Sequence, residues 1–155
     1  MTPRLLTGSA VFAVFAGTAV YLLDRSWSSV LFLAPFDAWQ PDRVGLFGAL
    51  GYSLPSLMHA YAFALLLILA LMPSRAARWL GPLAWLVVAA GLELLQADVA
   101  RAFIVEHFST AAGTPVGGAF YRFAFYGHFD VADLVATAIG VFAAWLTSFV
   151  LEKEP

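Results

Sequence analysis

Five ionisable or amide side chains stand inside or at the ends of long apolar segments, where they could bind a ligand or transfer a proton. They are His59, Glu93, Gln96, Asp130 and Asp133. Ionisable groups inside a membrane span are costly, so they usually face other helices and mark a site. Glu93 as a general base, with His59 or Asp133 as the acid, would suit a hydrolase of lipid-linked substrates.

Other features of the sequence favour a non-catalytic role. Cysteine is absent, and neither a Ser/His/Asp arrangement nor an HExxH motif appears. His59, Glu93 and Asp133 are metal-ligand types, but their spacing is not that of a known metal site. We therefore expect no catalytic residue, no metal and no cofactor.

Each candidate residue also has a purely structural interpretation. Asp130 or Asp133 could cap the N-terminus of a helix, where carboxylates are favoured. His59 could bond a neighbouring hydroxyl or carbonyl group. Glu93 could form a hydrogen bond with Gln96 or with His59. These alternatives stay open at the level of sequence.

The elements that must position these side chains are membrane-spanning helices. The 155-residue chain is 62% hydrophobic and 12% charged, whereas soluble domains are about 25% charged. A helix needs about 20 mostly apolar residues to cross a membrane. Four segments meet this requirement, which predicts an all-α fold: a four-helix transmembrane bundle forming one integral membrane domain over residues 1–155. The predicted spans are Leu5–Leu23, Leu54–Met72, Leu80–Ala97 and Val131–Leu151.

Because successive spans alternate in direction, the polar side chains fall at one depth. At ~1.5 Å per residue they lie within about 10 Å of one another along the membrane normal. Small and polar residues then follow Asp133 at helical spacing along the fourth span: Thr137, Gly140 and Ala144. Such a stripe allows close helix approach. We expect a polar pocket near the outer mouth of the bundle, lined by His59, Glu93, Gln96, Asp130, Asp133 and Thr137.

Charge predicts the orientation. The short connection Pro73–Trp79 carries Arg75 and Arg78, and short basic connections usually stay cytoplasmic. Both termini are then cytoplasmic, and the long connections Trp27–Ser53 and Asp98–Phe129 lie outside. These connections are rich in aromatic residues, which either lie among lipid head groups or form a docking surface for a protein or a lipid-like ligand. In the second connection, we expect Asp98–Phe108 to extend the third helix.

Three segments resemble the VanZ-like family of small bacterial membrane proteins. They are LPSLMHAYAF at residues 54–63, GLELLQ at residues 91–96 and FDVADLVATAIG at residues 129–140. The family pattern pairs Glu-x-x-Gln at one helix end with an Asp-rich start to the next helix. The chain departs from it at Thr137, where the family usually has Asn, and at Gly127, where it usually has Arg. The resemblance implies a location in the bacterial cytoplasmic (inner) membrane and an envelope role linked to glycopeptide antibiotic resistance.

Three hypotheses follow. The first is a binding protein that holds an envelope amphiphile or glycopeptide in the outer pocket. The second is an accessory structural subunit of a larger membrane protein complex, with membrane lipids and other proteins as its partners. The third is the intramembrane hydrolase that uses Glu93. The net charge of −2 shows no basic excess, so we expect no nucleic-acid partner.

Overall fold

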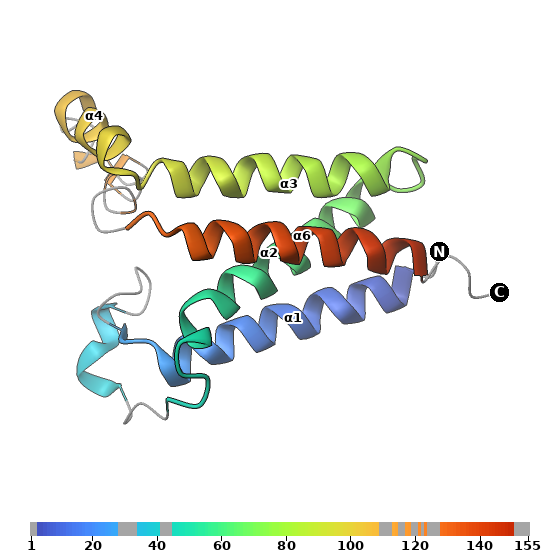
Figure 1. Cartoon of the computed structure of the whole chain (residues 1–155), viewed down its shortest axis with the longest axis horizontal. Helices are drawn as coiled ribbons and strands as arrows, with labels where there is room; N and C mark the ends of the chain where they lie inside the picture. The colour runs from blue at the N-terminus through green and yellow to red at the C-terminus, as the bar shows by residue number, and fades with distance from the viewer. Residues whose placement is uncertain are drawn as a thin grey trace.

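The computed structural model describes residues 3–27, 34–40, 45–108, 113–114, 117–118, 121, 123 and 128–150. Within these ranges the chain is helical and has no strand, which confirms the predicted fold class. Figure 1 shows α1, α2, α3 and α6 side by side along the long axis of the molecule. The elements are α1 (Pro3–Asp24), the short 3-10 helix η2 (Ala34–Trp39), α2 (Leu50–Leu71), α3 (Ala77–Leu94), α4 (Asp98–Phe108) and α6 (Val131–Val150).

Four of these helices, α1, α2, α3 and α6, are long and apolar enough to cross a membrane. The chain is therefore a multi-pass membrane protein, as predicted. α1 begins and α6 ends at one end of the bundle, and η2 and α4 lie at the other, which we call the loop end (Figure 1). α2 and α3 each begin a few residues before the predicted span, because helical backbone continues beyond the part that is apolar enough to lie in hydrocarbon.

One helix prediction is wrong. Asp98–Phe108 does not extend the third span: α3 ends at Leu94, a turn follows, and α4 is a separate helix that leaves the axis of α3 (Figure 1). The N–H groups of Gln96 and Ala97 donate to carbonyl oxygens only three residues back, which tightens and ends the helix. Asp98 then lies in the first turn of α4, where a carboxylate is favoured by the helix dipole.

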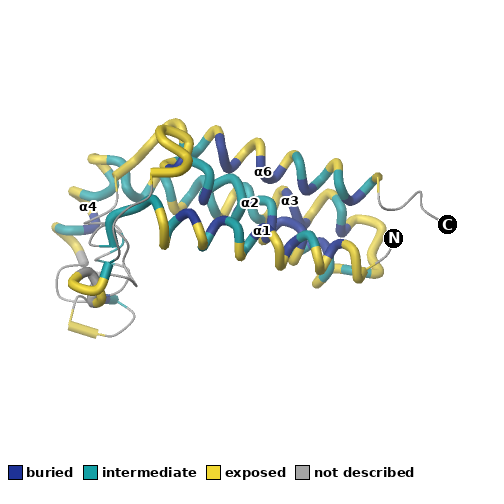
Figure 2. Tube along the Cα trace, turned by 90° about the horizontal axis from the view of Figure 1, so that it is seen from below, coloured by how far each residue is buried: buried dark blue, intermediate teal, exposed yellow. Residues whose placement is uncertain are grey.

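α2 is the central helix. It packs against α1, α3 and α6, and α3 also packs against α6. The side chains of Leu65 and Ile68 on α2 are fully buried, as is Leu6 on α1. Figure 2 shows that buried residues follow the sides of the helices that face one another, while exposed residues lie on the outside.

Small residues set how closely the helices approach. Ala10, Ala13 and Gly17 form the buried side of α1, and a Cβ added at Gly17 would lie 3.1 Å from Cε1 of His59. A Cβ added at Gly81 of α3 would lie 2.8 Å from the backbone nitrogen of Ile68. In a bilayer, where apolar side chains gain little by leaving lipid, such close packing is a main source of helix association.

The stripe on α6 allows a close helix approach, as the sequence predicts, and the structure shows that the approaching helix is α2. Thr137, Gly140 and Ala144 are all buried. A Cβ added at Gly140 would overlap the carbonyl oxygen of Leu57. Only glycine therefore allows this crossing of α2 and α6, and the crossing holds the start of α6 beside the start of α2.

The segment before α2 is fastened to the end of α1 by a carboxylate. The two oxygens of Asp24 accept the N–H groups of Leu46, at 2.8 Å, and of Phe47, at 2.9 Å. Gly51 makes room for this arrangement, since a Cβ there would lie 2.8 Å from Asp24 Oδ2. The loop ends of α1 and α2 are thereby kept together.

Candidate functional site: a polar cluster at the loop end

All four spanning helices contribute polar side chains to one region at the loop end of the bundle. We call this group the loop-end cluster; it comprises Tyr21 and Arg25 from α1 and its end, Ser56 from α2, Glu93 from α3, and Asp130 and Asp133 from the start of α6. Three of these residues, Glu93, Asp130 and Asp133, come from the set that the sequence analysis predicts to line a pocket.

Glu93 fixes the start of α6. Its Oε1 accepts the N–H of Asp130 at 2.8 Å, and Asp130 Oδ1 in turn accepts the N–H of Ala132 at 2.8 Å. Asp130 is thus the N-cap of α6, which is one of the two interpretations that the sequence leaves open. In a capping box the N-cap N–H is accepted by a glutamate three residues later. Here a glutamate from another helix takes that place, so α3 and α6 are joined at this point.

Asp133 faces α2. The Ser56 hydroxyl donates to Asp133 Oδ1 at 2.9 Å. Asp133 is partly buried, and the charges of Arg25 and Asp130 both act on its carboxyl group. The charge of Asp133 also acts on the carboxyl group of Glu93. Two carboxylates from different spans therefore lie close together, as the alternating directions of the spans predict.

Arg25 is the member of the cluster that the sequence analysis does not identify. Its guanidinium lies 5.2 Å from the centre of the Tyr21 ring and 5.8 Å from that of Tyr52, and Nη2 donates to the Tyr52 carbonyl oxygen. Nε is buried and, among the residues that the structure describes, has no hydrogen-bond partner. A signal was present in the sequence: Arg25 is the first cation after a long uncharged span. Nothing in one sequence says that it folds back over the bundle.

The charges in the cluster are mixed. The Tyr21 hydroxyl lies within the electrostatic influence of Arg25, Asp133 and Glu93 together. The arrangement can offer guanidinium N–H donors to an anion and carboxylate oxygens to hydroxyl or amine groups. Among the described residues, no group of three or more His, Cys, Asp or Glu side chains is placed to hold a metal ion.

The other three predicted site residues are not members of the cluster. His59 faces α1: its ring stacks on Tyr21 with 5.7 Å between ring centres, and it bonds the Pro55 backbone. Gln96 lies in the turn after α3, where its N–H donates to the Glu93 carbonyl oxygen at 3.0 Å. Thr137 is buried in the packing of α6. His59 therefore contacts the cluster only at the Tyr21 ring. Residue spacing along the chain does not predict this contact.

The long connections present aromatic side chains where the structure describes them. Trp39 of η2 is 77% exposed, and Phe103 of α4 is 56% exposed. Both rings lie near the loop end. This position is compatible with contact to lipid head groups and with a docking surface for a protein or a lipid-like ligand. Gly127 and several aromatic residues of the connections, among them Phe32, Phe120 and Phe125, lie outside the described residues.

The chain was compared with protein-family models, curated proteins and solved structures, and nothing matches it. The resemblance to the VanZ-like family therefore stays a prediction from three motifs.

Proposed function

We propose that this multi-pass membrane protein is a non-catalytic binding protein that holds the head group of a membrane amphiphile at the loop-end cluster. The observation that supports this most is the buried Nε of Arg25, which lacks a partner among the described residues. A buried donor left unpaired costs about 1–3 kcal/mol. An anionic group that Nε reaches after a rotation of the Arg25 side chain would remove that cost.

The composition of the cluster indicates the chemistry of the ligand. A guanidinium recognises phosphate or carboxylate through charge-assisted hydrogen bonds. The carboxylates of Glu93 and Asp133 accept hydrogen bonds from hydroxyl or amine groups. A head group that combines a phosphate with sugar hydroxyls or amines fits both, as in a lipid-linked envelope precursor. An amphiphilic glycopeptide carries similar groups, and the VanZ-like motifs favour such an envelope role.

The orientation is part of the proposal. Arg4, Arg75 and Arg78 lie at the end of the bundle where α1 begins and α3 begins. This end would face the cytoplasm of a bacterial cell by the positive-inside rule. The loop-end cluster would then open toward the outer leaflet of the cytoplasmic membrane.

Photocrosslinking tests the proposal. A benzoylphenylalanine probe at Gln96 lies in the turn beside Glu93, whereas the same probe at Val87 lies on the exposed part of α3, since Val87 is 65% exposed. After irradiation of native membranes, mass spectrometry of the adducts identifies what each probe captures. We expect the Gln96 probe to capture a phosphate-bearing amphiphile that the Val87 probe does not.

The variant Arg25→Gln serves as the discriminating control. Loss of a charge-assisted hydrogen bond of about 1.5–3 kcal/mol should lower the yield of that adduct at least about tenfold. Arg25→Lys keeps the charge and should give an intermediate yield. Capture of protein neighbours alone at Gln96, or of the same bulk lipids at both positions, would refute the proposal.

A second candidate function is an accessory subunit of a larger membrane complex. The observation in its favour is the exposed apolar surface outside the spans: Val99 is 85% exposed, and Trp39 and Phe103 are also exposed. Large exposed apolar side chains often mark interaction surfaces. Native mass determination after purification in mild detergent tests this: a hetero-complex that Trp39→Ser and Phe103→Ser disrupt supports it, and a monomer at all concentrations refutes it.

A further inference from the structure

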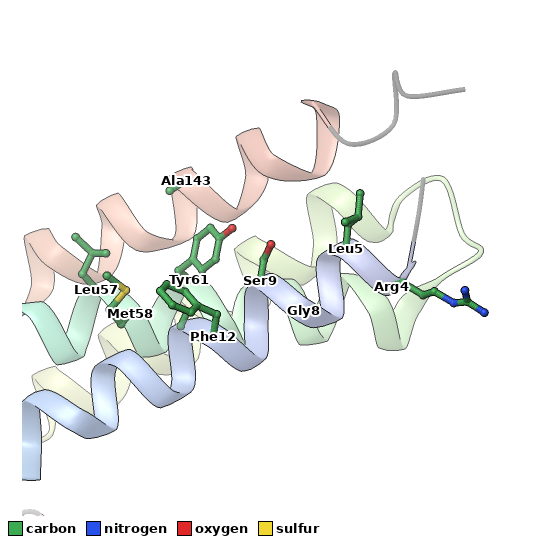
Figure 3. A pocket seen from close by; sticks show the side chains of 10 residues that line it. Arg4, Leu5, Gly8, Ser9, Phe12, Leu57, Met58, Tyr61 and Ala143 are labelled. Carbon is green, nitrogen blue, oxygen red and sulfur yellow. The ribbon is translucent and has the colours of Figure 1, made fainter.

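A groove runs along the bundle at the end away from the loop-end cluster. α1 and α6 form its sides and α2 forms its floor (Figure 3). Its volume is about 640 Å³. α2 packs against both α1 and α6, but α1 and α6 do not pack extensively against each other. The groove is the space that this arrangement leaves between them.

The lining of the groove is apolar along most of its length. Leu5, Phe12, Leu57 and Met58 supply hydrocarbon and ring surfaces. The phenol hydroxyl of Tyr61 already has a partner in Thr147. Thr147 Oγ1 donates its hydrogen to the Ala143 carbonyl oxygen at 2.9 Å. The Tyr61 hydroxyl, which lies 3.2 Å from Thr147 Oγ1, therefore donates to that oxygen. The exposure of Phe12, 71%, shows that this side of the groove is open to the surroundings of the bundle.

The length of the groove matches one leaflet. Arg4 and Ala13 both line it, and they are about 13 Å apart along α1 at ~1.5 Å per residue. The hydrocarbon core of a bilayer is about 30 Å thick, so one leaflet contributes about 15 Å. The groove therefore extends from the membrane surface at the termini end to near the bilayer midplane.

The volume distinguishes between occupants. If a methylene takes about the ~30 Å³ share of a water molecule, a chain of about sixteen carbons fills about 480 Å³. A spanning helix about 10 Å wide and about 30 Å long fills about 2,400 Å³. The 640 Å³ of the groove suits one acyl chain and is far too small for a helix.

The end of the groove at the membrane surface is cationic. Arg4 lines it there and is exposed, and among the described residues no carboxylate forms a salt bridge with Arg4. Figure 3 shows the Arg4 side chain at the end of the groove, beyond Leu5 and Ser9. Arg75 and Arg78 follow α2 at the same end of the bundle. An arginine at this depth attracts anionic lipid head groups.

We propose that the groove between α1 and α6 holds one acyl chain of an anionic phospholipid from the leaflet at the termini end, with the lipid phosphate beside Arg4. An acyl chain gains no hydrophobic free energy by leaving other acyl chains. Retention therefore comes from close packing along the groove, and the preference between lipids comes from the head-group charge. This site is separate from the loop-end cluster and does not depend on the proposed function.

Native mass spectrometry of the full chain tests this inference. The protein is placed in nanodiscs of equal parts phosphatidylglycerol and phosphatidylcholine with identical acyl chains, then released in the gas phase. We expect one retained lipid per chain, with about a fivefold preference for phosphatidylglycerol, the factor that one arginine near the surface supplies. Arg4→Gln should keep the retained lipid and lose the preference.

Two matched glycine variants separate the groove from the general lipid shell. Gly8 lines the groove, and a Cβ added there would have no atom within 4 Å. A Cβ added at Gly91 on α3, away from the groove, would also have no atom within 4 Å. Both positions thus accept a side chain without displacing the backbone. Gly8→Leu fills the groove and should abolish the retained lipid, whereas Gly91→Leu should leave it in place.

Three outcomes would overturn the inference: retention that survives Gly8→Leu, retention that Gly91→Leu abolishes equally, or a retained lipid without preference in the unaltered chain. A mass of two chains that Gly8→Leu converts to one would assign the groove to a second copy instead. Arg25→Gln does not alter the groove, so this variant should lose the loop-end adduct but keep the retained lipid. A failure of one proposal can therefore be told apart from a failure of the other.

Discussion

Replacement of Gly140 by alanine should loosen the bundle at its closest helix crossing. The new Cβ would overlap the Leu57 carbonyl oxygen and would lie 3.1 Å from the Leu57 carbonyl carbon and from the Tyr61 nitrogen. Ordinary Cβ contacts are 3.4–4 Å. All three atoms belong to the α2 backbone and cannot rotate away, so α6 must move outward by roughly an ångström.

The magnitude follows from the cost of overpacking. Forcing an extra methyl group into a well-packed site costs about 1–3 kcal/mol. Alanine also favours a helix over glycine by up to about 1 kcal/mol, which offsets part of that cost. The net expectation for Gly140→Ala is a decrease of about 1–2 kcal/mol in the free energy of unfolding. Displacement of α6 should also weaken the hydrogen bond between Ser56 and Asp133.

Unfolding in mixed micelles with increasing mole fraction of sodium dodecyl sulfate measures this free energy. Tryptophan fluorescence is a suitable signal, because Trp145 of α6 packs against Trp79 of α3 with 5.2 Å between ring centres. Gly91→Ala is the matched control, since a Cβ there meets no atom within 4 Å. A Gly140→Ala protein as stable as the Gly91→Ala protein would refute the reasoning about the crossing.

Three further predictions concern the cluster and the orientation. Glu93→Ala removes the acceptor of the N-cap N–H and should lower the free energy of unfolding by about 1–2 kcal/mol, measured in the same micelles, with Glu93→Gln retaining most of it. A double-mutant cycle of Ser56→Ala and Asp133→Asn should give a coupling of about 0.6–1.7 kcal/mol, and additive effects would contradict a hydrogen bond. Because the chain lacks cysteine, Trp39→Cys should react with an impermeant maleimide in intact bacterial cells and Ser74→Cys only after permeabilisation; the reverse pattern would invert the topology.

Much of the fold follows from the sequence for a simple reason. A run of about 20 apolar residues is long enough to span hydrocarbon, and backbone hydrogen bonding then requires a helix. The alternating directions of the spans place the start of α6 level with the end of α3, which is why Glu93, Asp130 and Asp133 meet. The stripe that contains Gly140 likewise marks a side of α6 that packs closely.

The sequence could not indicate which neighbouring helix each side of a span would face. Apolar residues surround every spanning helix, so no polar face distinguishes lipid from neighbour. The position of His59 could therefore not be predicted: it shares the depth of Glu93 but lies against α1. The break between α3 and α4 is similarly invisible, because the residues at 95–97 are compatible with a helix.

Sequence by itself determined that the chain has four spans, where they lie, and which polar residues share a depth, because these properties depend only on length, composition and direction. Tertiary structure decided that α2 is the central helix, that Glu93 accepts the N–H of the α6 N-cap, that Arg25 joins the cluster, and that a groove separates α1 from α6. These features depend on how each helix is rotated and where the helices cross. Backbone contacts at single glycines set that geometry, and an apolar pattern does not encode it.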